Sequence, residues 1–240
     1  MVQSVERALT LLGEASRSPG GLADLAERSG LAMSTASRLL STLEASGAVS
    51  RDDRGVYCVG PAIAAMGPSV AGATLQALAH PHLASLAGEL DEAVCLSVPL
   101  THETLTLVQV DLPRPVQAED WTGNRWPLTA GGSGLVMMAT WAEERVDEAL
   151  DGAARPAELD SVRESGICWT RGGYVEGLTS VAAAVLSPDE IGRASVVAYG
   201  PSFRFPPEDA RARIETRLRA CAAAISAELA AGWLERGRRP

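Results

Sequence analysis

The 240-residue sequence contains no lysine, so all 21 of its basic side chains are arginines. A nucleotide-binding loop of the P-loop type requires a lysine, and this class of phosphate site is therefore excluded. Every positive contact must use the planar guanidinium group, which can bind phosphate or guanine through two parallel hydrogen bonds. The many alanine, glycine and arginine residues indicate that a bias in base composition is the simpler explanation for the missing lysine.

Cysteine and histidine are also scarce. The four cysteines lack C-x-x-C spacing, and neither an N-terminal signal nor an apolar run of membrane length is present. We therefore expect a cytoplasmic protein with reduced thiols and no membrane partner. His80 and His82 would point about 200° apart on a helix, which argues against a metal site shared with Cys95, and Pro81 between them predicts a helix boundary. We expect no metal and no cofactor.

An enzyme is not expected either. Ser133 follows two glycines, but a nucleophile elbow needs a glycine two residues after the serine, where Leu135 stands. All three histidines precede this segment, and none lies in a recognisable triad context. A hydrolase would need a convergent catalytic group that the sequence does not reveal.

The length allows two domains, one of about 60 residues that would be marginal alone and one of about 150 residues with a larger core. The formal net charge is −9, which is unusual for a protein that contacts nucleic acid. Residues 1–60 contain six arginines against seven acidic residues, whereas residues 61–240 contain fifteen against 23. Most of the acidity therefore lies outside the N-terminal region.

The pattern of residues 22–59 is a helix, a tight turn, a second helix and a short β-ribbon, which is typical of a winged helix-turn-helix. Gly30 favours a sharp turn after the first helix. The ribbon should span residues 49–59, with a polar tip at residues 51–55. The apolar residues at helical spacing in the first helix are Leu22, Leu25 and Ala26.

The second helix predicts one apolar side and one polar side. Its inward stripe consists of Ala36, Leu39, Leu40 and Leu43, opposite Ser34, Arg38 and Ser41. A preceding helix over residues 4–16 should point Val5, Leu9 and Leu12 inward. Hydroxyls and a guanidinium on a free helix face suit the major groove of DNA, although any solvated helix also shows a polar side. The predicted DNA contacts are Ser34, Thr35, Ser37, Arg38 and Ser41 on the helix and Arg51 and Arg54 on the wing.

The run MSTASRLLSTLEASGAVSRDDRGVYCVGP resembles the recognition helix, wing and exit of IclR-type bacterial transcription regulators, and a weaker likeness continues through the rest of the chain. The resemblance implies a winged helix-turn-helix followed by a GAF-like α/β effector-binding domain. One departure is Met33, because relatives often carry a basic or polar residue just before the Ser-Thr pair.

The expected fold class is α/β (α+β), with a DNA-binding domain at residues 1–60, a linker helix at 61–78 and the GAF-like domain at 79–240. In the family the linker helps to join two protomers, whereas from sequence alone it could equally be an ordinary connecting helix. Residues 93–98 and 104–111 should form adjacent strands. A last helix over residues 207–234 should pack its apolar stripe on the core. That stripe consists of Ile214, Leu218, Cys221, Ile225 and Leu229.

Residues 126–134 end in a glycine run that leads into the helical stretch LVMMATW. Backbone N–H groups at such a helix start favour an anion, although the run could also be only a flexible turn. Arg171 would favour an acidic ligand unless it is a solvated loop residue, and the ring of Tyr199 would narrow the cavity. The resemblance places the effector pocket at Gly132, Ser133, Thr170, Leu178, Ser180, Val197 and Tyr199.

The sequence therefore predicts a transcriptional regulator whose binding to a double-stranded DNA operator is modulated by a small-molecule effector, a small organic acid or other carboxylate. Because the DNA-binding region is nearly neutral, we expect a homodimer or tetramer that reads half-sites about 34 Å apart or a multiple of that distance. The alternative is a GAF-like small-molecule sensor that acts through protein partners without contacting DNA.

Overall fold

The computed structural model describes residues 2–66, 71–112 and 119–236. The chain divides after Ala73 into two compact units. None of the helices in the described ranges combines the length and the apolar character needed to cross a bilayer.

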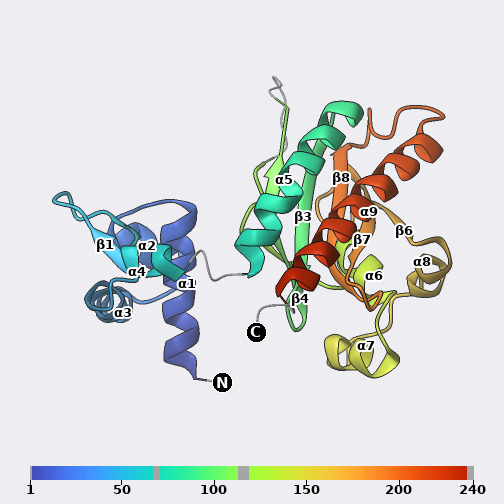
Figure 1. Cartoon of the computed structure of the whole chain (residues 1–240). Coiled ribbons are helices and arrows are strands. Elements are labelled where there is room, and N and C mark those ends of the chain that lie inside the picture. The colour runs from blue at the N-terminus through green and yellow to red at the C-terminus, as the bar shows by residue number, and fades with distance from the viewer. Residues whose placement is uncertain (1, 67–70, 113–118, 237–240) are drawn as a thin grey trace. The chain divides into compact units, whose positions relative to one another are not determined.

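The N-terminal unit is a three-helix domain with a two-stranded antiparallel wing (Figure 1). Gly30 makes the turn before the third helix with φ +64°, a conformation that glycine adopts without strain. The core joins all three helices to the wing through Leu11, Leu25, Leu40 and Tyr57. The predicted winged helix-turn-helix is confirmed. Its elements are α1 (Gln3–Arg17), α2 (Leu22–Arg28), α3 (Met33–Ala45), β1 (Val49–Arg51), β2 (Tyr57–Val59) and α4 (Pro61–Met66).

The inward face of α1 differs from the prediction. Leu11 and Ala15 are fully buried and Leu12 packs beside them, but Val5 and Leu9 are 56% and 61% exposed. Leu9 is two residues before Leu11 and is therefore rotated by about 200° around the helix. The helix carries apolar residues on two sides, and spacing alone does not say which side faces the core. The inward prediction for Val5 and Leu9 was wrong.

The C-terminal unit is built on a six-stranded antiparallel sheet in the order β5-β4-β3-β8-β7-β6. The predicted adjacent strands are confirmed as β3 (Ala93–Pro99) and β4 (Glu103–Val110), which pair with Val94 opposite Val110. The other strands are β5 (Arg125–Pro127), β6 (Ile167–Arg171), β7 (Leu178–Leu186) and β8 (Gly192–Pro201).

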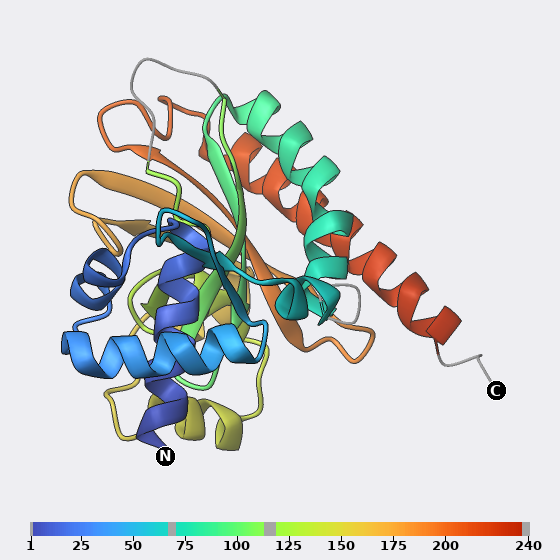
Figure 2. The same ribbon diagram turned by 90° about the vertical axis from the view of Figure 1, so that its left-hand side faces the viewer.

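Helices cover both faces of this sheet. The long helices α5 (Ala71–Leu90) and α9 (Arg211–Arg236) lie side by side on one face, as Figures 1 and 2 show from two directions. The predicted stripe of the last helix is confirmed, since its first four residues are buried against the sheet and Leu229 packs beside them. The other face carries α6 (Gly132–Met138), α7 (Glu143–Leu150) and α8 (Leu159–Ser165).

The helix boundary predicted at Pro81 was wrong, because α5 continues through it to Leu90. Proline removes one backbone hydrogen bond from a helix. Here Ala79 before it and Leu83 after it are fully buried in the same core, so packing on the sheet supports both halves. Of the linker region at residues 61–78, residues 61–66 form α4 and residues 71–78 belong to α5, while 67–70 lie outside the described residues.

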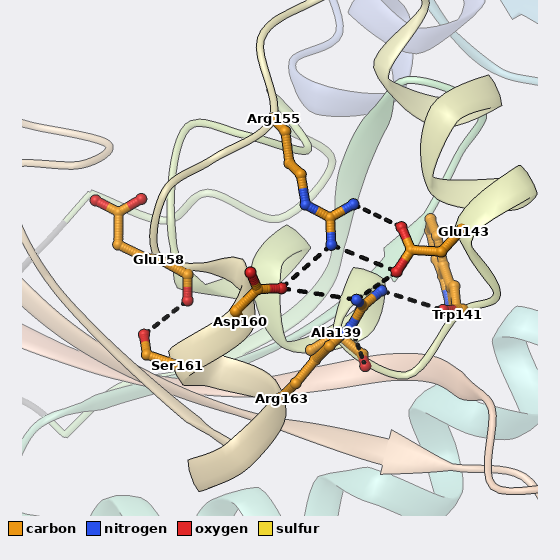
Figure 3. A network of polar contacts seen from close by, with 8 residues as sticks. All are labelled: Ala139, Trp141, Glu143, Arg155, Glu158, Asp160, Ser161 and Arg163. Carbon is orange, nitrogen blue, oxygen red and sulfur yellow. Dashed lines mark hydrogen bonds and ion pairs between the residues drawn. The ribbon is translucent and has the colours of Figure 1, made fainter.

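A network of arginines and carboxylates ties α7 to α8 (Figure 3). Arg155 donates to Glu143 Oε2 at 2.6 Å and to Asp160 Oδ1 at 3.2 Å. Arg163 also donates to Glu143, and its Nε donates to the carbonyl of Ala139 at 3.3 Å. The network therefore connects α7, α8 and the end of α6 on the side of the sheet that carries the predicted effector residues.

Candidate functional site

The polar side of α3 is free of the core of its own unit. Ala36 and Leu40 are fully buried, whereas Ser34, Ser37, Arg38 and Ser41 are exposed and Thr35 is half-buried. This exposed side is the arrangement that a helix needs to enter a DNA groove.

The wing brings its two predicted cations to the same end of the ribbon. Arg51 and Arg54 are exposed, and the Arg51 guanidinium lies over the Tyr57 ring at 5.2 Å from the ring centroid. The tip is fixed by Asp52, whose Oδ1 accepts hydrogen bonds from the N–H groups of Arg54 and Val56 at 3.0 and 2.8 Å.

A groove of about 270 Å³ between α1 and α3 adds a cation that the sequence interpretation did not single out. Arg7 of α1 and Arg38 of α3 both line it. Two guanidinium groups at one groove strengthen an anion site such as a DNA phosphate. The polar position of Arg7 near the start of α1 could have been noticed, but its approach to α3 depends on the tertiary packing. The remaining lining residues are Gln3, Ser4, Thr35, Leu39 and Thr42.

The predicted effector residues meet on the face of the sheet that packs against α6. Thr170, Ser180 and Tyr199 are paired in register across β6, β7 and β8, with Val197 two residues before Tyr199 on the same face. The Thr170 and Ser180 hydroxyls are hydrogen-bonded at 2.7 Å. Leu178 packs against the cluster that contains Val197 and Tyr199. The strands thus gather side chains that are separated by up to 29 positions in the sequence.

Glycines allow the start of α6 to lie directly on the strands. A Cβ added to Gly132 would lie 3.1 Å from both the Ala182 side chain and the carbonyl of Cys168. The next residue, Ser133, is buried, and its hydroxyl is 2.7 Å from the hydroxyl of Ser195 on β8. Gly132 and Ser133 therefore join the strand residues at one site.

Three aromatic side chains that the sequence prediction did not include, Trp121, Trp126 and Tyr174, join the predicted Tyr199 at this site. Tyr199 stacks on Trp121 with ring centroids 4.8 Å apart, and Trp121 meets Trp126 edge-on at 5.5 Å. Trp126 meets Tyr174 edge-on at 5.1 Å, and the Tyr174 hydroxyl accepts a hydrogen bond from the Ser133 N–H at 3.1 Å. Large aromatic residues near a glycine run are a usable signal, but Trp121 and Tyr174 lie in irregular segments whose path has no sequence periodicity to predict it.

The electrostatics of the site do not support nucleophilic chemistry. Burial raises the pKa of the Cys95 thiol to about 12 and that of Cys168 to about 11, so both thiols stay protonated at neutral pH. Burial also raises the pKa of Asp111, whose charge is close enough to act on the Tyr199 hydroxyl. Arg171 is exposed at the end of β6. The described residues contain no group of three or more His, Cys, Asp or Glu side chains placed to hold a metal ion.

Two family models match the chain. The IclR helix-turn-helix domain matches residues 4–53, and the C-terminal domain of the bacterial transcriptional regulator IclR matches residues 68–227. The chain belongs to the IclR family of bacterial transcriptional regulators.

Individual IclR-family proteins agree with this assignment. The chain is 34% identical to the HTH-type transcriptional regulator Rv1719 of Mycobacterium tuberculosis, over 85% of this chain and 84% of the relative. It is 32% identical to the glycerol operon regulatory protein of Streptomyces griseus, over 96% and 98%. The crystal structure of an IclR homolog from Microbacterium hydrocarbonoxydans, complexed with 4-hydroxybenzoate, shares the fold with a TM-score of 0.76 at 21% identity, covering 95% of this chain and 99% of that chain.

Membership of the IclR family selects one of the two functions that the sequence left open. The chain is a DNA-binding transcriptional regulator and not an enzyme. The alternative of a sensor that never contacts DNA was wrong.

Proposed function

We propose that this regulator binds its operator as a homo-oligomer through α3 and the wing, and that a small carboxylate held between α6 and the sheet modulates that binding. The observation that carries the proposal is the exposed polar side of α3, opposite the buried residues Ala36 and Leu40. The DNA contacts proposed on it and on the wing are Ser34, Thr35, Ser37, Arg38, Ser41, Arg51 and Arg54.

Arg38 is the central contact of this proposal. It is exposed on α3 and lines the groove together with Arg7. A guanidinium there can form two hydrogen bonds to a guanine edge or to a phosphate. Because residues 1–60 have almost no net charge, one DNA-binding unit should bind weakly. Two units joined in an oligomer should bind more tightly, because binding of the first unit holds the second close to its half-site.

The far side of α1 supports self-association. Val5 and Leu9 of α1 are 56% and 61% exposed and lie four residues apart, and Val2, which directly precedes the helix, is 65% exposed. Such a stripe is the pattern by which one helix packs on another. In a homo-oligomer, a second copy of the chain would cover these exposed apolar residues.

Hydrogen-bonding groups at the α6 site support a polar effector. The Ser133 N–H, the Ser133–Ser195 hydroxyl pair and the Thr170–Ser180 hydroxyl pair all lie on this face. A carboxylate accepts hydrogen bonds from such donors. Because the negative charge of Asp111 near Tyr199 would repel the carboxylate, we expect the carboxylate to lie close to Ser133. The IclR homolog from Microbacterium hydrocarbonoxydans was crystallised with 4-hydroxybenzoate, which carries this group. An effector changes DNA binding only if it binds two arrangements of the oligomer unequally.

DNA binding is tested with a duplex selected from a random library by the purified protein. Fluorescence anisotropy should show affinity falling steeply between 50 and 200 mM salt, because counterions are released from the neutralised phosphates. Arg38→Ala should weaken binding by about 1–3 kcal/mol without changing circular dichroism or oligomer mass. Arg125→Ala, an exposed arginine of the C-terminal unit paired with Glu103, is the matched control and should leave affinity unchanged. Equal affinities of all three proteins would remove Arg38 from the interface.

Effector binding is tested by a thermal-shift screen of carboxylic acids that includes 4-hydroxybenzoate. A ligand present at 100 times its dissociation constant adds about 2.7 kcal/mol to stability. A compound that stabilises the wild type should also change its affinity for the selected duplex, and Ser133→Ala should reduce both effects. If no acid changes the thermal stability or the affinity for the duplex, the proposal of a carboxylate effector is refuted.

A further inference from the structure

Tyr174 reaches the α6 site from an outer loop. It lies between β6 and β7 in the sequence GGYVEG, and its neighbours Gly173 and Val175 are exposed. The hydroxyl accepts the Ser133 N–H hydrogen bond at 3.1 Å, and the ring lies so close to Gly131 that an added Cβ would overlap it. The Tyr174 hydroxyl therefore already accepts the hydrogen bond from the Ser133 N–H that an effector would accept.

The loop is attached at its ends, and Tyr174 is its large inward side chain. Gly172 and Gly177 adopt φ values of +70° and +81°, which glycine tolerates, and the Gly177 carbonyl accepts a hydrogen bond from the Ser202 N–H at 2.8 Å. Outward movement of residues 173–176 would break the Ser133–Tyr174 hydrogen bond, the edge contact with Trp126 and the hydrogen bond from the Leu178 N–H to the Val175 carbonyl at 3.2 Å, while β6 and β7 stay paired.

A second observation at the same site points independently to a ligand. Tyr199 is 2% exposed, and its hydroxyl has no hydrogen-bond partner among the described residues. Leaving a buried hydroxyl unpaired costs about 1–3 kcal/mol, so such a group calls for a partner that arrives with another molecule. Tyr199 belongs to the same aromatic series as Tyr174, joined through Trp121 and Trp126.

We propose that Tyr174 is an internal occupant of the effector site, holding the place of a single-ring aromatic effector whose oxygen accepts the Ser133 hydrogen bond. The inference rests on the proposed effector function of this site. The effector ring takes the position between Gly131 and Trp126 that the Tyr174 ring holds, at one end of the aromatic series that leads to Tyr199. Phenols and aromatic carboxylates both supply the required oxygen.

The occupant sets the apparent affinity of the site. An effector binds only to molecules in which the ring of Tyr174 has moved out, so its apparent dissociation constant is the intrinsic one divided by the fraction of open molecules. Removing the ring should therefore strengthen binding, whereas removing an ordinary wall of a pocket weakens it. This difference in sign makes the proposal testable.

The experiment measures binding of 4-methylphenol, benzoate and toluene to the full-length wild type, Tyr174→Ala and Tyr174→Phe by calorimetry and by tryptophan fluorescence. Tyr174→Ala should bind 4-methylphenol, which is the deleted side chain itself, at least about tenfold more tightly than the wild type. Toluene, which lacks the oxygen, should gain less. Comparing benzoate with 4-methylphenol shows whether the site prefers a carboxylate or a phenol oxygen. Phe203→Ala removes an aromatic ring that is 84% exposed and should match the wild type.

Tyr174→Phe keeps the ring and frees the Ser133 N–H, so benzoate should bind it about two- to tenfold more tightly than the wild type. This variant decides the matter if Tyr174→Ala does not fold. Unchanged or weaker binding of every probe to the folded variants would overturn the occupancy proposal. An effector response in the operator assay would still stand in that case, so the two proposals can fail separately.

Discussion

Arg204 holds the buried carboxylate of Glu92 through two parallel hydrogen bonds, from Nε to Oε1 at 2.6 Å and from Nη2 to Oε2 at 2.9 Å. Glu92 is 8% exposed and directly precedes β3, while Arg204 follows β8. The pair therefore connects the start of one central strand with the segment after its neighbour. A carboxylate buried at this level depends on its partner, because water no longer solvates it.

Arg204→Ala should lower the free energy of unfolding of the C-terminal unit by about 2–4 kcal/mol, because it leaves the Glu92 carboxylate buried without a partner. Urea denaturation followed by tryptophan fluorescence measures this unit alone, since all five tryptophans lie after residue 120. Arg217→Ala breaks the exposed pair with Glu89 and is the matched control, with an expected loss of about 0–1 kcal/mol. Similar losses in the two variants would contradict a special role for burial.

The network between α7 and α8 should make stability depend on pH. Hydrogen bonds from Arg155, and then from Arg163, lower the pKa of Glu143 from 4.5 to about 2. A carboxyl group whose pKa is lower in the folded state stabilises the fold above pH 4.5, and this contribution is lost as the pH falls toward 2. The stability difference between wild type and Glu143→Gln should therefore be largest near pH 5.5 and shrink by pH 3.

Because Glu143 is exposed, this pH-dependent difference should be small and should fall further in 1 M salt. Glu144→Gln changes the neighbouring exposed glutamate in the same helical turn and serves as the control. A Glu143→Gln difference that stays constant with pH, or equals that of Glu144→Gln, would show that the network does not stabilise the folded state.

Periodicity predicted α3 well and α1 poorly, for a physical reason. In α3 the apolar residues form one stripe, so Arg38 and the serines could only lie opposite Leu40. In α1 there are two apolar sides, and only the packing against α2 and α3 selects Leu11 for the core over Leu9. Pro81 misled in the same way, because tertiary packing supports a helix that local propensity would end.

The predicted effector residues had two sources in the sequence. The glycine run before α6 pointed to the start of that helix, whereas Ser180 and Tyr199 were placed by the family resemblance, and their pairing across β7 and β8 is seen only in the structure. Tyr174 and Trp121 reach the same site from irregular segments, whose path is fixed by side-chain contacts and backbone turns rather than by a repeating pattern. The set of effector residues therefore stays a prediction, and the sequence did not indicate that Trp121 and Tyr174 lie beside Tyr199 and Ser133.

Contact between Gly131 and the Tyr174 ring should appear as coupling between two substitutions. Gly131→Ala places a methyl group inside the ring position and should cost about 1–3 kcal/mol, because the φ of Gly131 (−164°) is itself acceptable for alanine. In a Tyr174→Ala background the space is empty, so the same change should cost much less. A double-mutant cycle from urea denaturation gives the coupling energy. Additive effects would show that the ring does not rest on Gly131 in solution.

Two glycines of the C-terminal unit should respond to alanine with opposite signs. Gly88 lies within α5 with no atom within 4 Å of an added Cβ, so Gly88→Ala should stabilise the unit by about 0.5–1 kcal/mol through helix propensity. Gly134 lies in α6 against the backbone of Leu128, where an added Cβ would overlap the carbonyl group. Backbone cannot rotate away as a side chain can, so Gly134→Ala should lower stability by about 3 kcal/mol or more and separate α6 from the segment before it. Tryptophan-detected denaturation of the two single variants measures both effects, and a neutral Gly134→Ala would mean that α6 is not anchored on Leu128.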